Sequence, residues 1–164
     1  MKKILLCFIV SVSFLLISKH SNAQGYTTAI GLKFGGFENG ISVKYFTDSD
    51  VSLEGVVGFR TDGVVITGLY EFNQQAFGVN ELKFYYGAGA HIGAIGSGIY
   101  HRYNGLEDDY TSGHLLLGID GVIGLEYSIP DLPLAISLDL NPRLELATGP
   151  FVDLAPGLGL KYTF

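Results

Sequence analysis

The chain has 164 residues, of which 10 are lysine or arginine and 16 are aspartate or glutamate, giving a formal net charge of −6. A chain of this length fits one domain, and its acidic balance argues against a nucleic-acid partner, which would require a basic face. The single cysteine, Cys7, excludes an internal disulfide framework and a thiolate metal site.

The first 23 residues have the three parts of a secretory signal. Lys2 and Lys3 precede an apolar run over residues 4–17, and the small residue Ala23 closes a short polar stretch. A helix that spans a membrane needs about 20 apolar residues, and this run is shorter. We therefore expect a cleavable signal peptide over residues 1–23 and one mature domain over residues 24–164.

Cleavage after Ala23 would remove Cys7 and shift the charge balance. Cys7 lies inside the apolar run, without the preceding small residue of a lipid-attachment site, so we expect it to leave with the signal. The signal carries three lysines and no acidic residue. The mature chain from Gln24 therefore keeps seven basic residues against sixteen acidic ones.

Residues 25–36 show the period-two alternation of a strand with two different faces. One face is bulky and apolar, with Tyr26, Thr28, Ile30, Leu32 and Phe34. The other face is small or charged, with Thr27, Ala29, Gly31, Lys33 and Gly35. The pattern recurs between turn residues and predicts eight strands, at roughly 25–36, 40–47, 51–60, 64–73, 81–93, 113–128, 133–147 and 151–164.

The predicted fold class is all-β, an eight-stranded antiparallel up-and-down transmembrane β-barrel. An even strand number brings both termini to one side, which in outer-membrane barrels is the periplasm. Aromatic girdles are expected at both interfaces. The predicted periplasmic strand ends carry Tyr26, Tyr45, Tyr70, Phe72, Phe84, Tyr86, Tyr127, Tyr162 and Phe164, and the opposite ends carry Phe34, Phe37, Phe59 and Phe151.

A soluble lipocalin-like barrel also alternates, but it buries its apolar face and turns its charges outward. Two features of the sequence argue against it. Glycine, with 23 residues in all, gathers on the charged face, where a crowded eight-strand interior gains from missing side chains. The chain also ends in alternating hydrophobic residues that close on a phenylalanine, namely Leu158, Leu160, Tyr162 and Phe164.

This ending resembles the assembly signal of outer-membrane barrels, and residues 25–164 resemble the small eight-stranded barrels of the OmpA membrane-domain and OmpX type. The resemblance implies a monomer in the outer membrane, in contact with membrane lipid and lipopolysaccharide. It also implies recognition by the barrel-assembly machinery through Leu160, Tyr162 and Phe164. Pro142 and Pro156 depart from the pattern because each removes a ladder donor, and bulges there would reconcile them with it.

The expected inner face carries six of the seven mature basic residues and a similar number of acids. These charged residues are Lys33, Lys44, Glu54, Arg60, Glu71, Lys83, Asp120, Glu126, Asp139, Arg143, Asp153 and Lys161. An eight-strand lumen is just wide enough for side chains, and an isolated buried ion costs several kcal/mol, so these charges must be paired. The favoured interpretation is a salt-bridged plug. The alternative is a narrow pore or a small-ligand-binding barrel.

Small outer-membrane barrels include lipid A deacylases and palmitoyl transferases, so a lipid A-modifying enzyme is the rival function. The deacylase pattern His-x-Ser does not follow His91, His101 or His114. Ser112 and His114 share a face, but Asp120 lies about 20 Å from His114 at about 3.4 Å per residue. We therefore expect no enzymatic activity, no catalytic residue and no cofactor.

Metal binding is an equally weak prediction. His91 and His114 end and begin neighbouring strands near the outer rim, but two imidazoles without a third ligand seldom make a site. The run Glu107-Asp108-Asp109 lacks the ligand spacing of a calcium loop. No metal ligand is assigned.

The longest connection, residues 94–112, is where we expect any contact outside the cell. It is rich in tyrosine, arginine and asparagine, which binding loops favour. The candidate contacts are Tyr100, Arg102, Tyr103, Asn104 and Tyr110. Alternatively, Tyr100 and Tyr103 extend the aromatic girdle. The expected role is thus structural or one of surface interaction.

Overall fold

A computed structural model describes residues 26–36, 38–60, 63–101, 105, 107–110, 112–147 and 150–164. The predicted signal peptide, residues 1–23, lies outside these residues. The strands are β1 (Thr28–Gly35), β2 (Asn39–Asp48), β3 (Val51–Arg60), β4 (Gly63–Ala76), β5 (Val79–Ile95), β6 (Gly98–His101), β7 (Glu107–Tyr110), β8 (His114–Ser128), β9 (Leu134–Glu145) and β10 (Phe151–Thr163). Nothing helical in the described part of the chain has the length and apolar character needed to cross a membrane.

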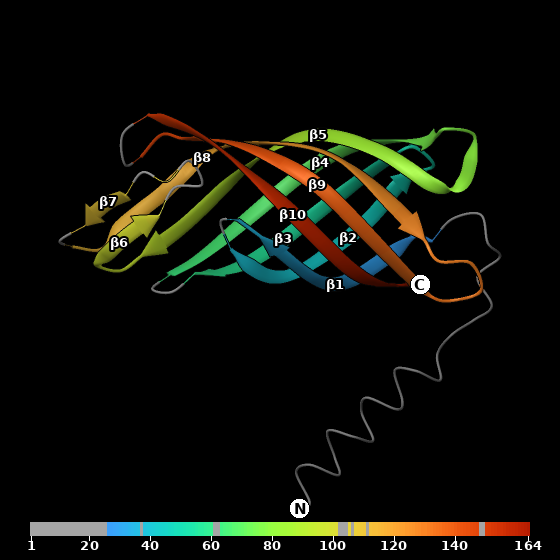
Figure 1. Cartoon of the computed structure of the whole chain (residues 1–164), viewed down its shortest axis with the longest axis horizontal. Coiled ribbons are helices and arrows are strands. Elements are labelled where there is room, and N and C mark those ends of the chain that lie inside the picture. Colours follow the sequence, from blue (N-terminus) through green and yellow to red (C-terminus); the bar gives the residue numbers. More distant parts are fainter. Residues whose placement is uncertain are drawn as a thin grey trace, which may run out of the picture.

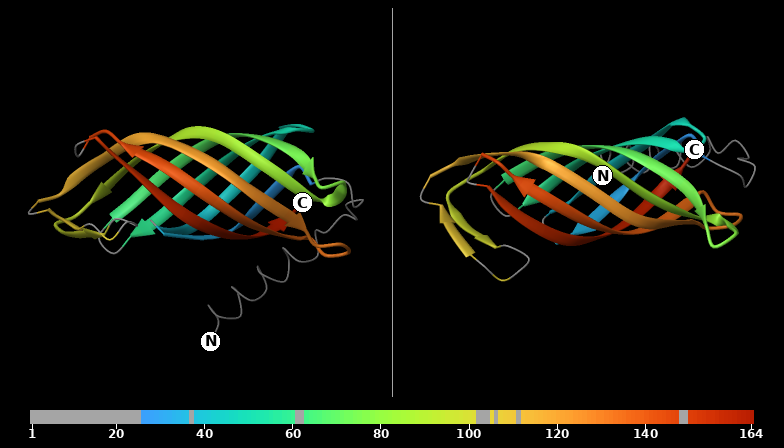
Figure 2. Two further views of the ribbon diagram at one scale, coloured as in Figure 1. Left: turned by 45° about the horizontal axis from the view of Figure 1, so that its top comes forward. Right: turned by 90° about the horizontal axis from the view of Figure 1, so that it is seen from above.

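Eight of these strands close into an antiparallel barrel in the order β1-β10-β9-β8-β5-β4-β3-β2. Each strand pairs with its neighbours along the chain, so the predicted all-β, eight-stranded up-and-down barrel is confirmed (Figure 1). The strands tilt strongly across the barrel (Figure 2). The C-terminus lies at one end, and the two-stranded β6–β7 ribbon projects from the other. We call these the terminal end and the ribbon end.

The two faces of the barrel wall differ in the way the alternation predicts. In β8, Leu117 is 45% exposed on the outside, whereas its neighbour Leu116 is 1% exposed inside. The same alternation runs along the other barrel strands. Charged side chains such as Glu54 and Lys161 are each 1% exposed. The outside is therefore apolar and the inside largely polar.

Glycines on the inner face let the strands and their side chains pack closely. A Cβ atom at Gly89 would lie 1.8 Å from the carbonyl oxygen of Gly68 on the neighbouring strand. A Cβ atom at Gly31 would lie 2.0 Å from the carbonyl oxygen of Leu160 across the β1–β10 seam. Any larger residue would force these strands apart. The predicted crowding of the interior is thus found at the β4–β5 and β1–β10 strand pairs.

Two expectations about elements are corrected. Tyr26 was expected on the lipid-facing side, but it precedes β1, is 8% exposed and packs inside against Phe46 with ring centroids 5.2 Å apart. The alternation of β1 does not extend to it. The predicted strands 64–73 and 81–93 are also too short at their facing ends, because β4 and β5 form a long hairpin in which Ala76 pairs with Val79.

Neither proline marks a bulge in the strand pairing. The register of β9 with β8 is the same at Asp120–Arg143 and at Ile123–Leu140, on either side of Pro142. Pro142 instead fits because Gly121 faces it, and a Cβ atom there would lie 2.9 Å from the proline ring.

Pro156 lies where β1 ends. The amide of Gly36 donates to the Pro156 carbonyl at 3.0 Å, one residue beyond the last β1–β10 pair. A residue in an antiparallel strand directs its amide and its carbonyl to the same side. The missing amide of Pro156 therefore costs no bond of the barrel ladder. The register shifts that do occur lie elsewhere, at Phe46/Asp48 and Gln75/Ala76.

The tip of the β4–β5 hairpin generates a stability prediction. Phe77 and Gly78 form its two-residue turn with φ angles of 52° and 72°, the left-handed pair of a type I′ turn. Phenylalanine is strained there and is 88% exposed, so packing does not compensate. Phe77→Asn should raise the free energy of unfolding by about 1 kcal/mol, measured by urea titration of the protein in detergent or lipid. Gly78→Ala should lower it, and a stabilising alanine would contradict this description of the turn.

Candidate functional site: the charged interior

The charged side chains on the inner walls form the candidate site. Of the twelve charged residues predicted for the lumen, Arg60 and Lys83 are partly exposed and the other ten are buried. Side chains two residues apart on a strand point to the same face of the wall, so each strand directs its charged residues into the interior. Because such charges need partners, the pairing within the barrel determines what the interior can do.

Near the terminal end, two lysines bridge three glutamates, and we call these five residues the terminal-end cluster. Lys161 Nζ lies 3.0 Å from Glu54 and 3.3 Å from Glu126. Lys44 Nζ lies 3.1 Å from Glu71 and 3.5 Å from Glu126. Each of the five side chains is at most 1% exposed. The cluster joins β2, β3, β4, β8 and β10 across the inside of the barrel.

Neutral polar side chains extend the terminal-end cluster. The Tyr26 hydroxyl donates to Glu126, and the Ser52 hydroxyl donates to Glu71 at 3.1 Å. The Asn73 amide donates to Ser52 at 2.8 Å and its oxygen accepts from Lys44 at 3.0 Å. The tyrosine and the asparagine therefore add to the shell of partners that stabilises the ions.

A smaller group occupies the middle of the barrel. Lys33 Nζ lies 3.1 Å from Asp139, and the Tyr85 hydroxyl donates to the same carboxylate at 2.6 Å. Tyr85 is 0% exposed, and a Cβ atom at Gly124 would lie 2.7 Å from its ring. The tyrosine thus fills the centre of the lumen in space that a glycine of β8 leaves open.

Near the ribbon end, a chain of ionisable side chains crosses the mouth. It links Arg60, Glu38, Arg143, Asp120, His91 and Glu145, and we call it the ribbon-end cluster. Glu38 contacts Arg60 at 2.8 Å and Arg143 at 3.0 Å, and Arg143 Nε lies 2.6 Å from Asp120. Because its two arginines come from β3 and β9, four places apart in the eight-strand ring, the cluster connects opposite walls.

His91 stands between two carboxylates in this cluster. Its Nδ1 lies 2.8 Å from Asp120, and its Nε2 lies 2.9 Å from Glu145. Glu145 also accepts the backbone amide of Leu117 at 2.9 Å, which fixes the carboxylate at the end of β9. Each ring nitrogen thus has a carboxylate oxygen within hydrogen-bond distance. Both ring nitrogens are therefore engaged within the protein.

Glu38 is held as an ion in this arrangement. Burial alone would raise the pKa of its carboxyl, but the guanidinium groups of Arg143 and Arg60 lower that pKa below its usual value. Arg60 donates to it through Nε at 2.9 Å and Nη2 at 2.8 Å, and Arg143 donates through both terminal nitrogens at 3.2 and 3.0 Å. Charge-assisted bonds of this kind are the stronger class.

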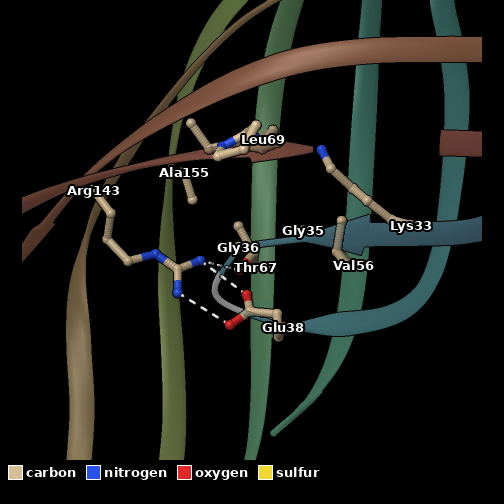
Figure 3. A pocket seen from close by; sticks show the side chains of 11 residues that line it. Lys33, Gly35, Gly36, Glu38, Val56, Thr67, Leu69, Arg143 and Ala155 are labelled. Carbon is tan, nitrogen blue, oxygen red and sulfur yellow. Dashed lines mark hydrogen bonds and ion pairs between the residues drawn. The ribbon is translucent and has the colours of Figure 1, made fainter. Parts of the chain in front are cut away.

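A cavity of about 40 Å³ lies beneath Glu38. Its polar lining includes Lys33, Thr67, Asn141 and Arg143, and its apolar lining includes Leu69. Figure 3 shows the Glu38 carboxylate facing the Arg143 guanidinium at its edge. At about 10–15 Å³ for each water, such a volume suits a few waters or one small molecule. The part of the interior next to Glu38 is thus not completely filled by side chains.

Sequence reasoning missed three members of the interior. Glu38 lies in the β1–β2 connection, where alternation assigns no face. Glu145 has the same parity as Arg143 and lies within the predicted strand 133–147, so the alternation already assigns it to the inner face. Tyr26 was placed on the wrong face. His91 was expected inside, but its two carboxylate partners depend on the register between strands, which the sequence pattern does not define.

Two of the residues predicted as external contacts belong to the ribbon end of the barrel. Tyr100 lies in β6 opposite Asp108, and Tyr110 lies in β7 opposite Gly98. Arg102, Tyr103 and Asn104 lie outside the described residues.

The proposed assembly residues Leu160, Tyr162 and Phe164 lie at the seam of the barrel. There, Phe164 exchanges backbone hydrogen bonds with Thr27 and Thr28. Whether they act as an assembly signal stays a prediction.

The serine and histidine considered for catalysis meet through the backbone of the serine. His114 Nδ1 lies 2.6 Å from the backbone carbonyl of Ser112. Within the part of the chain that the structure describes, no three histidine, cysteine or acidic side chains are grouped so as to hold a metal ion.

Comparisons with known proteins extend only to the fold. No protein-family model matches the sequence, and no curated protein matches it. Among solved structures, the chain is similar to the crystal structure of Neisserial surface protein A, with 14% sequence identity, a TM-score of 0.44, and coverage of 84% of this chain and 93% of that chain. This likeness concerns the fold alone, which the chain's own strand pairing already defines.

A matched pair of lysine variants tests how much the terminal-end cluster contributes to stability. Lys161→Met should destabilise the barrel by about 3–5 kcal/mol, because it leaves Glu54 and Glu126 buried with fewer partners. Lys83→Met should cost only about 1 kcal/mol, since Lys83 is partly exposed and lies 4.3 Å from the centre of the Phe46 ring. Urea unfolding in lipid vesicles measures both, and equal losses would contradict the ion-pair account.

Proposed function

We propose that this chain is an integral outer-membrane β-barrel protein of the small eight-stranded OmpA membrane-domain and OmpX type, with a structural or surface-interaction role. The observation that carries the proposal is the inverted distribution of its side chains. Large apolar residues cover the outside of the barrel, whereas charged residues gather inside. A water-soluble barrel has the opposite arrangement.

The apolar outer surface extends around the whole barrel. Each strand contributes at least one large apolar side chain that is 44–61% exposed, namely Ile30, Ile41, Leu53, Ile66, Ile92, Leu117, Leu138 and Leu158. Soluble monomers seldom expose contiguous apolar patches larger than a few hundred Å². A bilayer would cover this surface, and the closed ladder leaves few backbone groups unpaired toward lipid.

Aromatic residues at the terminal end support a membrane interface there. Tyr45, Tyr70, Phe72, Tyr86 and Tyr127 are each 40–48% exposed on the outside. Phe72 stacks on Tyr86 with ring centroids 5.6 Å apart and meets Tyr70 edge-on at 5.3 Å. Rings of this kind occupy the membrane–water interface in outer-membrane barrels. We place this end at the periplasm and the β6–β7 ribbon at the cell surface.

The interior supports a closed lumen and a role other than catalysis. Ion pairs cross it at both ends, and Tyr85 fills its centre. A water-filled channel takes about 16 strands. The proposed partners are therefore membrane lipid and lipopolysaccharide around the wall, the assembly machinery during insertion, and any external partner at the ribbon.

Arginine substitutions test the membrane assignment. Ile119→Arg or Leu138→Arg, on outward positions of β8 and β9, should cost roughly 2–4 kcal/mol in bilayer folding near the midplane. Val152→Arg, near the ribbon end of β10, should cost less because it lies closer to an interface. The measurement is the free energy of unfolding in lipid vesicles. A penalty that does not depend on depth would contradict a barrel that spans a bilayer.

Planar-bilayer recording tests the closed lumen. The protein should show no stable single-channel conductance, because the ion pairs and Tyr85 block a continuous water path. Steady conductance of the unaltered protein would instead favour the narrow-pore alternative. Mass spectrometry of lipid A from cells with and without the protein provides the corresponding test of the enzymatic alternative.

A further inference from the structure

We propose that the ribbon-end mouth of the barrel is a binding site for a small carboxylate, and that the side chain of Glu38 occupies this site as an internal competitor. The proposal goes beyond the structural role and does not depend on the membrane assignment. It rests on the arginines around Glu38, on the space available to the Glu38 side chain, and on the position of Glu38 in the connection between β1 and β2.

The two arginines present the donors that recognise a carboxylate. Arg60 and Arg143 contact the single Glu38 carboxylate from opposite walls, through four N–H···O contacts of 2.8–3.2 Å. A planar guanidinium matches the two oxygens of a carboxylate better than a lysine does. Thr67 adds a hydroxyl 3.3 Å from Arg143 at the same place. The groups around Glu38 therefore have the chemistry of a carboxylate site.

The wall of the barrel leaves room for an inserted side chain. Glu38 lies over Gly58 of β3, where an added Cβ atom would be 2.3 Å from the Glu38 Cγ. The cavity of about 40 Å³ continues beneath it, toward Lys33 (Figure 3). Asn141 also lines this cavity. The space over Gly58 and the adjoining cavity together form a slot that is larger than the Glu38 side chain alone requires. This slot would admit the carboxylate and a short carbon chain of a ligand.

Glu38 can leave this slot without breaking the barrel. β1 ends at Gly35 and β2 begins at Asn39, so Glu38 belongs to neither strand. Rotation of its side chain alone would release the carboxylate, and the ladder hydrogen bonds would stay in place. A tethered group of this kind competes at an effective concentration in the millimolar range. An external carboxylate at similar concentration can then exchange with it.

The test uses acetate as the probe, with the purified protein in detergent micelles at neutral pH and constant ionic strength. Glu38→Ala removes the competitor, and the same-sized Glu38→Gln keeps the side chain but removes its charge. Acetate affinity is measured by isothermal titration and by the rise in melting temperature. It should be highest for Glu38→Ala, intermediate for Glu38→Gln and lowest for the unaltered protein. The first and last should differ by about tenfold or more.

Two controls separate this site from a general salt effect. Chloride at equal ionic strength should not stabilise Glu38→Ala, and Arg60→Met combined with Glu38→Ala should abolish acetate binding. If Glu38→Ala does not fold, the comparison of Glu38→Gln with unaltered protein decides. Equal acetate affinity in the variants and the unaltered protein, or tighter binding of inorganic phosphate than of acetate, would overturn the proposal.

Discussion

The pairing of charged side chains inside a closed ring of strands is the constraint on which the rest of this structure depends. A buried ion costs several kcal/mol unless partners surround it, and within the barrel those partners are other side chains. Lys161 and Lys44 each meet two glutamates, and Arg143 meets Glu38 and Asp120. The Lys161–Glu54 and Lys44–Glu126 pairs join strands that are not neighbours in the sheet, so they tie distant walls together.

This constraint explains features that are otherwise unrelated. Because large polar side chains fill the interior, space must come from the wall, and glycines such as Gly118 and Gly124 lie beside the rings of His91 and Tyr85. Because the polar groups lie inside, the apolar residues of each strand are left on the outside. The apolar surface and the glycine-rich inner face are thus two consequences of one arrangement.

Most of the fold follows from the period-two alternation, because alternation reports directly on a wall with two different faces. It predicted the eight barrel strands and their antiparallel order. It failed where the chain leaves the ladder: Tyr26 and Glu38 both lie outside strands, yet both point into the interior. The partners of His91 were beyond sequence reasoning because Asp120 and Glu145 meet it only through the register between strands. The fit of the two prolines was also beyond sequence reasoning, because it depends on Gly121 and on the end of β1, which are properties of neighbouring strands.

The central claim is that the apolar face of the wall meets lipid and the charged face does not meet water freely. Spin labels at outward positions such as Leu117, Ile136 and Leu160, studied in lipid vesicles, test it most directly. The account predicts strong relaxation by lipid-soluble oxygen and weak relaxation by a water-soluble nickel chelate, with the contrast greatest at mid-strand. Labels that the nickel chelate reaches equally at all three positions would contradict a membrane-spanning barrel.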